Sequence, residues 1–318
     1  MTDSAIQPRI TAIAPWFGGK RGLAGTVVEE LGVHSAYWEP FCGSCAILFA
    51  KPPSSHETVI DLHGDLTNLA MVIASDQCGR LVEGLRHTLC CENLFRTAKQ
   101  FLEADDTCPP ASPQLVGPSH VARAYWYFVI AWVGRNGVAG TRRVNYQMAV
   151  RWTPGGGHGG QRFASAVDSL PWWHRRLRRV LILNRDAFEV IPRIEDVPGV
   201  AVYCDPPYFM DTRGTGRQRG PSGGGSNYLH DFAEADHARL ATELARFSRA
   251  RVVVSYYDSP ALAELYPPGG WTKRAVYRPK NLHVQNRRGS SKCTAPEVLL
   301  LNGPSYAMGD DLFGTGGQ

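Results

Sequence analysis

The stretch AVYCDPPY, residues 201–208, decides the fold that this sequence predicts. A run of strand-forming residues stops at Asp205, so the pattern predicts a buried strand that ends at Cys204. Ligands of open α/β sheets bind beyond the carboxyl ends of the strands, where the Asp205 carboxylate would lie. The two prolines fix the backbone and leave carbonyl acceptors, and Tyr208 offers a flat ring. Together these groups predict a receptor for an amine on a planar ring; the alternative is a turn that only caps the strand.

Strand and helix patterns alternate on both sides of this stretch. Short apolar runs bounded by turn residues alternate with longer runs of helical character. This rhythm predicts an α/β fold with a doubly wound, mostly parallel sheet. The predicted strands occupy 37–41, 57–62, 180–184, 199–204, 250–258 and 296–302, and the predicted helices 44–50, 65–74 and 234–248.

The middle of the chain has a different character. A helical run, a proline-rich break, an aromatic helix and a glycine- and arginine-rich stretch follow one another there. We therefore predict a mainly helical domain at 78–179, inserted between two parts of a catalytic domain, 1–77 and 180–318. The glycine-rich stretch 212–226 cannot build a core and is predicted to be a mobile loop.

The composition is that of a globular protein, since 43% of the 318 residues are hydrophobic and 20% are charged. No apolar run reaches the ~20 residues needed to cross a bilayer, and the polar N-terminus lacks a secretion signal. We therefore expect a cytoplasmic protein whose eight cysteines stay reduced. Cys42 and Cys45 have the spacing of half a zinc site, but the matching half is missing, so no metal is predicted.

Positive charge is concentrated between residues 120 and 180. That segment carries a charge of +9, whereas the whole chain carries +5. A solvated basic face is one interpretation, but arginines interleaved with aromatic residues favour neutralisation of nucleic-acid phosphates. The ten arginines, against the single acid Asp168, are Arg123, Arg135, Arg142, Arg143, Arg151, Arg162, Arg175, Arg176, Arg178 and Arg179.

An ordered set of motifs resembles the Dam-like family of DNA adenine-N6 methyltransferases, including its phage-borne members. The opening of the chain, two glycine- and acid-containing loops, the DPPY stretch and two late strands follow one another as in that family. The middle resembles the family's recognition region more weakly, at RNGVAGTRRVN (135–145) and RWTPGG (151–156). The other motifs are APWFGGK (14–20), YWEPFCGSCAILFAKPP (37–53), ETVIDLHGDLTNL (57–69), VLILNRDAFEVI (180–191), YCDPPY (203–208), VVVSYYDS (252–259) and PEVLLLN (296–302).

The resemblance implies a Rossmann-like catalytic domain that binds S-adenosyl-L-methionine and uses no metal. Lys20 would pair with the carboxylate of the methionine part, and Asp61 would accept hydrogen bonds from the ribose hydroxyls. Asp65 competes for that second role, but it is better explained as an acid at a helix N-terminus. The full set of implied cofactor-binding residues is Trp16, Lys20, Glu39, Phe41, Gly43, Ser44, Asp61, Asp186, Phe188 and Asp205.

The resemblance also implies the reaction: site-specific methylation of the N6 amine of an adenine flipped out of double-stranded DNA. Asp205 and the Pro206 carbonyl would accept hydrogen bonds from the amine, Pro207 would hold the turn rigid, and Tyr208 would stack on the base. Residues expected to contact DNA are Arg135, Asn136, Arg142, Arg143, Asn145 and Arg151. A monomer is expected, and a cognate restriction enzyme stays open as a partner.

One departure from the family pattern keeps alternatives open. Cys45 stands where the second glycine of the loop is expected, so either the backbone there has a negative φ or the cysteine is strained. A DNA-binding relative with impaired catalysis is therefore one alternative. An RNA or protein-glutamine methyltransferase of the same fold is another, although such enzymes usually have asparagine in place of Asp205. A dinucleotide oxidoreductase is disfavoured because the loop lacks GxGxxG spacing.

Overall fold

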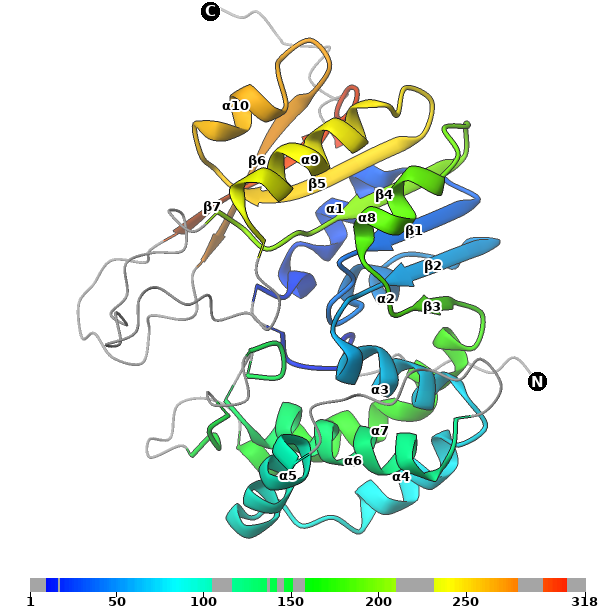
Figure 1. Cartoon of the computed structure of the whole chain (residues 1–318), viewed down its shortest axis with the longest axis vertical. Coiled ribbons are helices and arrows are strands. Elements are labelled where there is room, and N and C mark those ends of the chain that lie inside the picture. The colour runs from blue at the N-terminus through cyan, green and yellow to red at the C-terminus, as the bar shows by residue number, and fades with distance from the viewer. Residues whose placement is uncertain are drawn as a thin grey trace, which may run out of the picture.

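The computed structural model is built on a mixed sheet whose seven strands lie in the order β3-β2-β1-β4-β5-β7-β6 within the described residues (Figure 1). The first five strands pair in parallel, and β7 runs antiparallel to both β5 and β6. This topology confirms the predicted Rossmann-like α/β class. The described residues are 10–16, 18–104, 116–135, 138–141, 146–150, 158–209, 232–279 and 294–307. The strands are β1 (Ala36–Pro40), β2 (His56–Ile60), β3 (Leu181–Leu183), β4 (Val200–Cys204), β5 (Arg251–Tyr257), β6 (Thr272–Pro279) and β7 (Thr294–Leu301).

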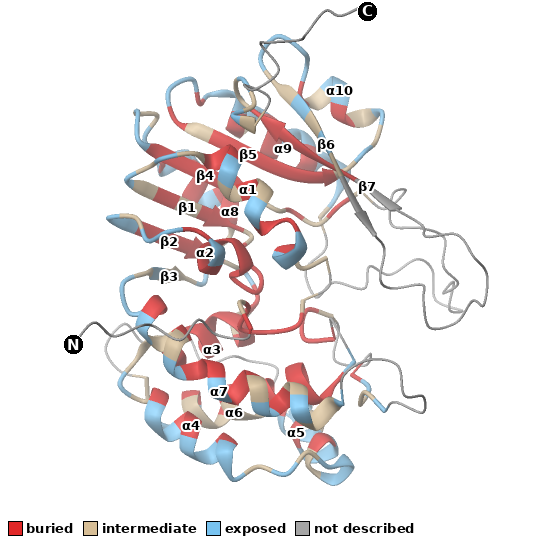
Figure 2. Ribbon diagram, turned by 180° about the vertical axis from the view of Figure 1, so that it is seen from behind, coloured by how far each residue is buried: buried red, intermediate tan, exposed pale blue. Residues whose placement is uncertain are grey.

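Both faces of the sheet are covered by helices, which explains the continuous apolar runs of its central strands. Along β4, Ala201 and Tyr203 pack into the core on the side of α1 and α2. Val202 and Cys204 pack on the opposite side, against α8 and α9. Figure 2 shows the buried sheet between these layers. The helices of the two layers are α1 (Ala24–Leu31), α2 (Ala46–Ala50), α8 (Ala187–Val190), α9 (Glu234–Ala245) and α10 (Ala261–Leu265).

Five further helices pack together beyond the β3 edge of the sheet, at the bottom of Figure 1. Large aromatic side chains fill their centre: Tyr127, Phe128, Trp132 and Trp173 are fully buried. The last helix runs through Pro171 because its buried residues hold it in the helical core despite the missing N–H donor. These helices are α3 (Gly64–Ala74), α4 (Cys78–Arg86), α5 (Glu92–Ala104), α6 (Pro118–Val133) and α7 (Gly159–Leu177).

The N-terminal segment, Ile10–Trp16, joins the helical part to the sheet. The indole N–H groups of Trp173 and Trp132 donate to the carbonyls of Ile10 and Ile13, at 2.8 and 3.1 Å. The Ile13 N–H donates to the Ser44 carbonyl at 3.1 Å, in the loop after β1. At its end, Trp16 forms an antiparallel bridge with Val138. A single extended segment therefore contacts both parts of the molecule.

Three of the ten arginines of the basic segment make contacts inside the protein, so the interpretation of that segment as phosphate contacts does not extend to them. Arg123 is buried and pairs with Asp65 at 2.5 Å, which ties α6 to the first turn of α3 and confirms Asp65 as a helix N-terminal acid. Arg162 donates to the carbonyls of Trp132 and Gly134, each at 2.8 Å, and so caps the end of α6. The third is Arg176.

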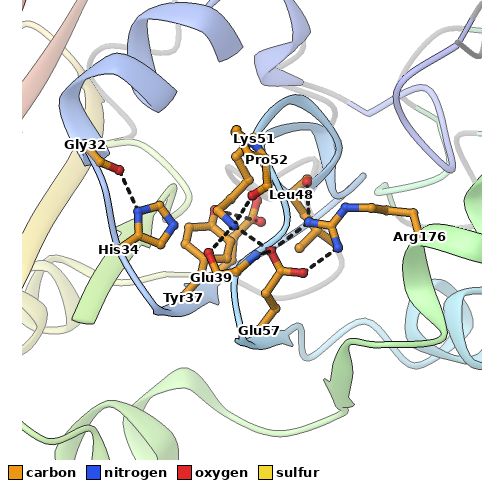
Figure 3. Close-up of polar contacts among 10 residues, drawn as sticks. Gly32, His34, Tyr37, Glu39, Leu48, Lys51, Pro52, Glu57 and Arg176 are labelled. Carbon is orange, nitrogen blue, oxygen red and sulfur yellow. Dashed lines mark hydrogen bonds and ion pairs between the residues drawn. The ribbon is translucent and has the colours of Figure 1, made fainter. Parts of the chain in front are cut away.

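Arg176 belongs to a buried charge cluster centred on Glu57 (Figure 3). Its guanidinium forms a two-pronged ion pair with Glu57, and Nη2 also donates to the Leu48 carbonyl at 3.0 Å. Lys51 contacts the same carboxylate at 2.5 Å. Burial raises the pKa of Glu57, but Arg176 and Lys51 outweigh it and lower the pKa below its usual value. The cluster fastens the last turn of α7 to β2 and to the end of α2.

Candidate active site

A cavity of about 240 Å³ opens at the carboxyl ends of β1, β2 and β4. Every residue that the sequence assigned to cofactor binding or catalysis lines this cavity, although those residues come from widely separated parts of the chain. The parallel strands account for this, because their carboxyl ends meet at one edge of the sheet. Around the cavity lie Trp16, Lys20, Glu39, Phe41, Gly43, Ser44, Asp61, Asp186, Phe188, Asp205, Pro206, Pro207 and Tyr208.

One end of the cavity, at the DPPY turn, is a cluster of charged groups around Lys20. Its ammonium lies 2.9 Å from Oδ1 of Asp205 and 3.0 Å from Oε1 of Glu297. The same Glu297 oxygen accepts a hydrogen bond from the Tyr208 hydroxyl at 2.7 Å. The ammonium also lies 4.7 Å from the centre of the Tyr208 ring. Two elements distant in sequence, which carry Lys20 and Glu297, therefore converge on the DPPY turn.

Burial controls the protonation of this cluster. Burial raises the pKa of Asp205 to about 6, although Lys20 opposes the rise. Burial lowers the pKa of Lys20, but Asp205 and Glu297 outweigh it and raise the pKa above its usual value. Lys20 is therefore a cation at neutral pH, and Asp205 is an anion that becomes protonated in mild acid.

The expected pairing of Lys20 with the methionine carboxylate stays a prediction, and within the protein the lysine has other partners. Lys20 is paired with two carboxylates of the protein itself, Asp205 and Glu297. The sequence pattern GGK placed this lysine at the cavity correctly, but its partners could not be recognised locally. Glu297 lies 277 residues further along the chain, on β7.

The loop after β1 has an unusual backbone conformation. Phe41, Gly43 and Cys45 all have left-handed φ values, of 66°, 46° and 59°. Glycine is needed at position 43 for a second reason, because a Cβ there would lie 2.9 Å from Nε1 of Trp16. The loop therefore combines a tight turn with close packing against the Trp16 indole. The indole lies between Gly43 of this loop and Gly140 of the helical part.

Cys45, like Phe41, is a non-glycine residue of this loop with a left-handed backbone. The alternative of a negative φ is wrong, since φ is 59° at the N-cap of α2. A left-handed conformation costs a residue with a side chain roughly 1–2 kcal/mol. The side chain is buried, with its sulfur 4.0 Å from that of Cys42, and Cys45 itself does not line the cavity whereas Cys42 does.

Replacing Cys45 with glycine should leave the affinity for S-adenosyl-L-methionine unchanged or tighten it, by up to about tenfold. Glycine removes the backbone strain, and the lost thiol faces the core and not the cavity. Calorimetric titration of both proteins tests this, with Gly43→Ala as the matched control that should bind more weakly. Several-fold weaker binding by Cys45→Gly would show that the thiol makes a favourable contact of its own.

Asp61, at the end of β2, stabilises the loop after β1. Its two carboxylate oxygens accept hydrogen bonds from the backbone N–H groups of Gly43 and His63, each at 2.8 Å. A carboxylate oxygen has two lone pairs, so ribose hydroxyls can share these oxygens with the backbone. Asp61 thus positions the turn at Gly43 as well as lining the cavity.

Glu39 is a buried acid beside the same loop. It accepts a hydrogen bond from the Tyr37 hydroxyl at 2.9 Å, and burial raises its pKa to about 8. The carboxyl group is therefore protonated at neutral pH, although the charge of Lys51 opposes this. Binding of an ammonium group at this position would favour the ionised form.

The far end of the cavity is aromatic. The Asp186 carboxylate accepts from the Phe188 N–H at 2.9 Å and so caps α8, which orients the Phe188 ring. Phe188 stacks against Phe232 with ring centres 5.8 Å apart, and the Arg239 guanidinium lies 4.3 Å from its centre. Such an apolar slot with an acid at its edge suits a flat heterocycle.

Several residues in or beside the cavity were not foreseen from the sequence. Glu297 lies beside it and contacts Lys20 and Tyr208, which line it. Glu297 had a signal, because it is the single charge in the apolar strand PEVLLLN. Asp236 and Arg239 come from α9, and Gly140 comes from the helical part, where its missing Cβ leaves room for Trp16. Of the predicted DNA contacts, Arg135 is exposed at the end of α6. The others, Asn136, Arg142, Arg143, Asn145 and Arg151, lie outside the described residues.

The chemistry of the lining fits S-adenosyl-L-methionine, a ligand with a cationic sulfur, an ammonium group, hydroxyls and a flat base. Acids line the cavity along its length, at Glu39, Asp61, Asp186 and Asp205, and aromatic rings lie among them. Within the described residues, no group of three or more histidine, cysteine or acidic side chains could hold a metal ion. No helix in the same part of the chain is both long and apolar enough to cross a membrane.

The sequence relatives of the chain agree with the chemistry of this cavity. A model of the D12 class N6 adenine-specific DNA methyltransferase family matches residues 16–277. The chain is 25% identical over 305 residues to the Retron Ec67 DNA adenine methylase of Escherichia coli, covering 95% of each protein. Among solved structures, it resembles a precorrin-6y C5,15-methyltransferase from Geobacter metallireducens, with a TM-score of 0.33, 9% identity and coverage of 88% and 85%. It also resembles the rRNA methyltransferase AviRa from Streptomyces viridochromogenes, with a TM-score of 0.34 and 13% identity, covering 88% of this chain and 82% of that one.

Proposed function

The chain belongs to the D12 class of N6 adenine-specific DNA methyltransferases, and on that premise we propose how its residues carry out the reaction. It is a DNA methyltransferase that transfers a methyl group from S-adenosyl-L-methionine to the N6 amine of adenine. The observation that supports the assignment of roles is the cavity, where the DPPY turn and the loop after β1 face each other.

We assign cofactor binding to the loop after β1 and its neighbours. Glu39 and the Phe41–Ser44 turn would hold the methionine part, Asp61 the ribose, and Asp186 with Phe188 the adenine. Trp16 would close over the methionine end because its indole packs on Gly43. When bound, S-adenosyl-L-methionine supplies a methyl group as an electrophile on a positively charged sulfur.

The catalytic work falls to the DPPY turn. Asp205 and the Pro206 carbonyl accept hydrogen bonds from the target amine, which draws the nitrogen lone pair out of conjugation with the ring. Pro207 holds this turn rigid, and Tyr208 packs on the base. Asp205 is also placed to accept the proton that the amine loses. Positioning of the amine supplies much of the rate enhancement, and no covalent enzyme intermediate is needed.

An adenine inside a duplex cannot reach this cavity, so we propose that the enzyme flips it out of double-stranded DNA. The helices α4–α7 and the connection between α6 and α7 would form the target-recognition domain. Gly140, in that connection, lines the same cavity as the DPPY turn. Arg135 would contact DNA there, together with Asn136, Arg142, Arg143, Asn145 and Arg151. The site of action would be the cytoplasm, where such DNA lies.

Transfer of tritium from methyl-labelled S-adenosyl-L-methionine tests this function. Duplex DNA should be labelled, and its nucleosides should contain N6-methyladenine. Sequencing genomic DNA from an expressing host that lacks adenine methylation should then reveal a preferred sequence. Labelled RNA or labelled protein in place of DNA would instead support the alternative substrates of this fold. Cofactor binding without any transfer would indicate an impaired relative.

A further inference from the structure

Glu297 contacts two residues of the active site, Lys20 and Tyr208, yet the mechanism above gives it no task. Its side chain is 3% exposed and projects from β7, which is the antiparallel strand of the sheet. One oxygen, Oε1, accepts from both the Lys20 ammonium, at 3.0 Å, and the Tyr208 hydroxyl, at 2.7 Å. Burying a carboxylate is costly unless it is paired and hydrogen-bonded. Glu297 is held in this way by two residues of the active site, which indicates a role in that site.

Within the part of the chain that the structure describes, all three donors of the Lys20 ammonium are in use. An ammonium group has three donors, and in the structure its contacts are the Gly18 carbonyl at 2.9 Å, Asp205 at 2.9 Å and Glu297 at 3.0 Å. The short 3₁₀ helix η1 (Lys20–Gly22) holds the lysine at this point. The lysine is therefore committed to the catalytic carboxylate and to Glu297, and not to a cofactor carboxylate.

We propose that Lys20 and Glu297 are positioning residues that set the charge and orientation of the catalytic carboxylate. Glu297 anchors the Lys20 ammonium and the Tyr208 hydroxyl. Lys20 in turn binds Oδ1 of Asp205, so that the rest of the carboxylate meets the amine of the base. This inference rests on the proposed function and deepens it, since it concerns the same site.

The two residues act on Asp205 in opposite directions. Lys20 stabilises the ionised carboxylate, whereas the negative Glu297 destabilises it. Without Lys20, two buried carboxylates would share a site and one of them would bind a proton. Among the other titratable groups near Asp205, the tyrosines, the thiol and the protonated Glu39 are neutral at pH 7. They are Glu39 on β1, Tyr203 and Cys204 on β4, Tyr208 on the DPPY turn, and Tyr256 on β5.

The test measures kcat for methylation of duplex DNA between about pH 5 and pH 9, together with calorimetric binding of S-adenosyl-L-methionine. In the wild-type enzyme, activity should fall as the pH drops through about 6, because Asp205 becomes protonated. Lys20→Met should move this midpoint upward by at least about one pH unit, with activity partly recovered at high pH. Lys20→Arg keeps the charge and should stay near the wild-type midpoint.

Glu297→Gln should move the midpoint in the other direction, to lower pH. Glutamine is isosteric, and its amide oxygen can still accept from Lys20 and Tyr208, so the geometry survives while the charge is lost. Glu297→Leu removes the anchor as well and should lower kcat by about tenfold or more, with cofactor affinity within a few-fold of wild type. A purely structural role would not move the two midpoints in opposite directions.

Three outcomes would overturn the proposal. One is an unchanged pH profile in Glu297→Gln, and another is a Lys20→Met enzyme that binds the cofactor weakly but keeps the wild-type midpoint. The latter result would make Lys20 a cofactor ligand. The third is an equal loss of activity at every pH in both variants. If Lys20→Met does not fold, as judged by its thermal unfolding, Lys20→Arg and Glu297→Gln still decide. A wild-type protein that methylates no adenine in DNA would refute the proposed function itself, which is a different result.

Discussion

Replacing Asp205 with alanine should reduce kcat for DNA methylation by about a thousandfold or more, while the protein remains folded. The substitution removes the acceptor that draws out the amine lone pair. It leaves no uncompensated buried charge, because Lys20 stays paired with Glu297 at 3.0 Å. The affinity for S-adenosyl-L-methionine should stay within about tenfold of wild type. Single-turnover transfer of labelled methyl groups and calorimetric titration measure the two quantities separately.

Asp186→Ala is the matched control for this experiment. It removes a carboxylate from the same cavity, but at the end assigned to the cofactor adenine, and it should weaken cofactor binding more than it lowers kcat. Asp205→Asn keeps one acceptor oxygen and should lose less activity than Asp205→Ala. Turnover by Asp205→Ala at a rate near wild type would refute the mechanism.

The largest expected effect on stability belongs to Arg176. Replacing it with alanine should lower the free energy of unfolding by about 3 kcal/mol, because Glu57 stays buried and keeps, among the described residues, Lys51 alone as a charged partner. The Leu48 carbonyl also loses its donor. Urea unfolding followed by circular dichroism measures the change.

The neighbouring Arg175 supplies the control, since it is exposed on the same turn of α7. Arg175→Ala should change the free energy of unfolding by less than about 0.5 kcal/mol. If Arg176→Ala instead kept full stability and lost affinity for DNA, the buried pair would have no structural importance. That result would return Arg176 to the group of phosphate contacts.

The central sheet could be predicted from the sequence because its strands have strong local signals. β4 and β5 are apolar runs bounded by turn residues, since both of their faces are buried. β1 and β2 carry polar residues as well, but most of their residues are buried. β6 was not predicted. It reads TKRAVYRP and owes its strand conformation to pairing with β7, a contact with residues some twenty positions away. α7 was not predicted either, because its glycines and Pro171 are poor helix formers and burial of Trp173 outweighs them.

The residues that line the site could be predicted, whereas their hydrogen-bond and ion-pair partners could not. Motif order placed Lys20, Asp61 and Asp205 at one cavity, because each follows or precedes an element with a clear pattern. The partners of these residues depend on long-range packing: Glu297 for Lys20, and the backbone of Gly43 for Asp61. The arginines show the same limit, since a charged side chain that is buried in an ion pair has no local signature that separates it from an exposed one.

The N-terminal segment sets a rule for building chimeric enzymes with new target sequences. Exchanging only residues 78–179 between relatives would bring foreign partners against Ile10 and Ile13, whose carbonyls accept from Trp173 and Trp132. It would also replace the strand partner of Trp16, and with it the support of the loop that begins after β1. Donor segments should therefore be transplanted together with their own residues 10–16. A graft made this way keeps the native contacts between the target-recognition domain and the N-terminal segment that connects it to the catalytic sheet.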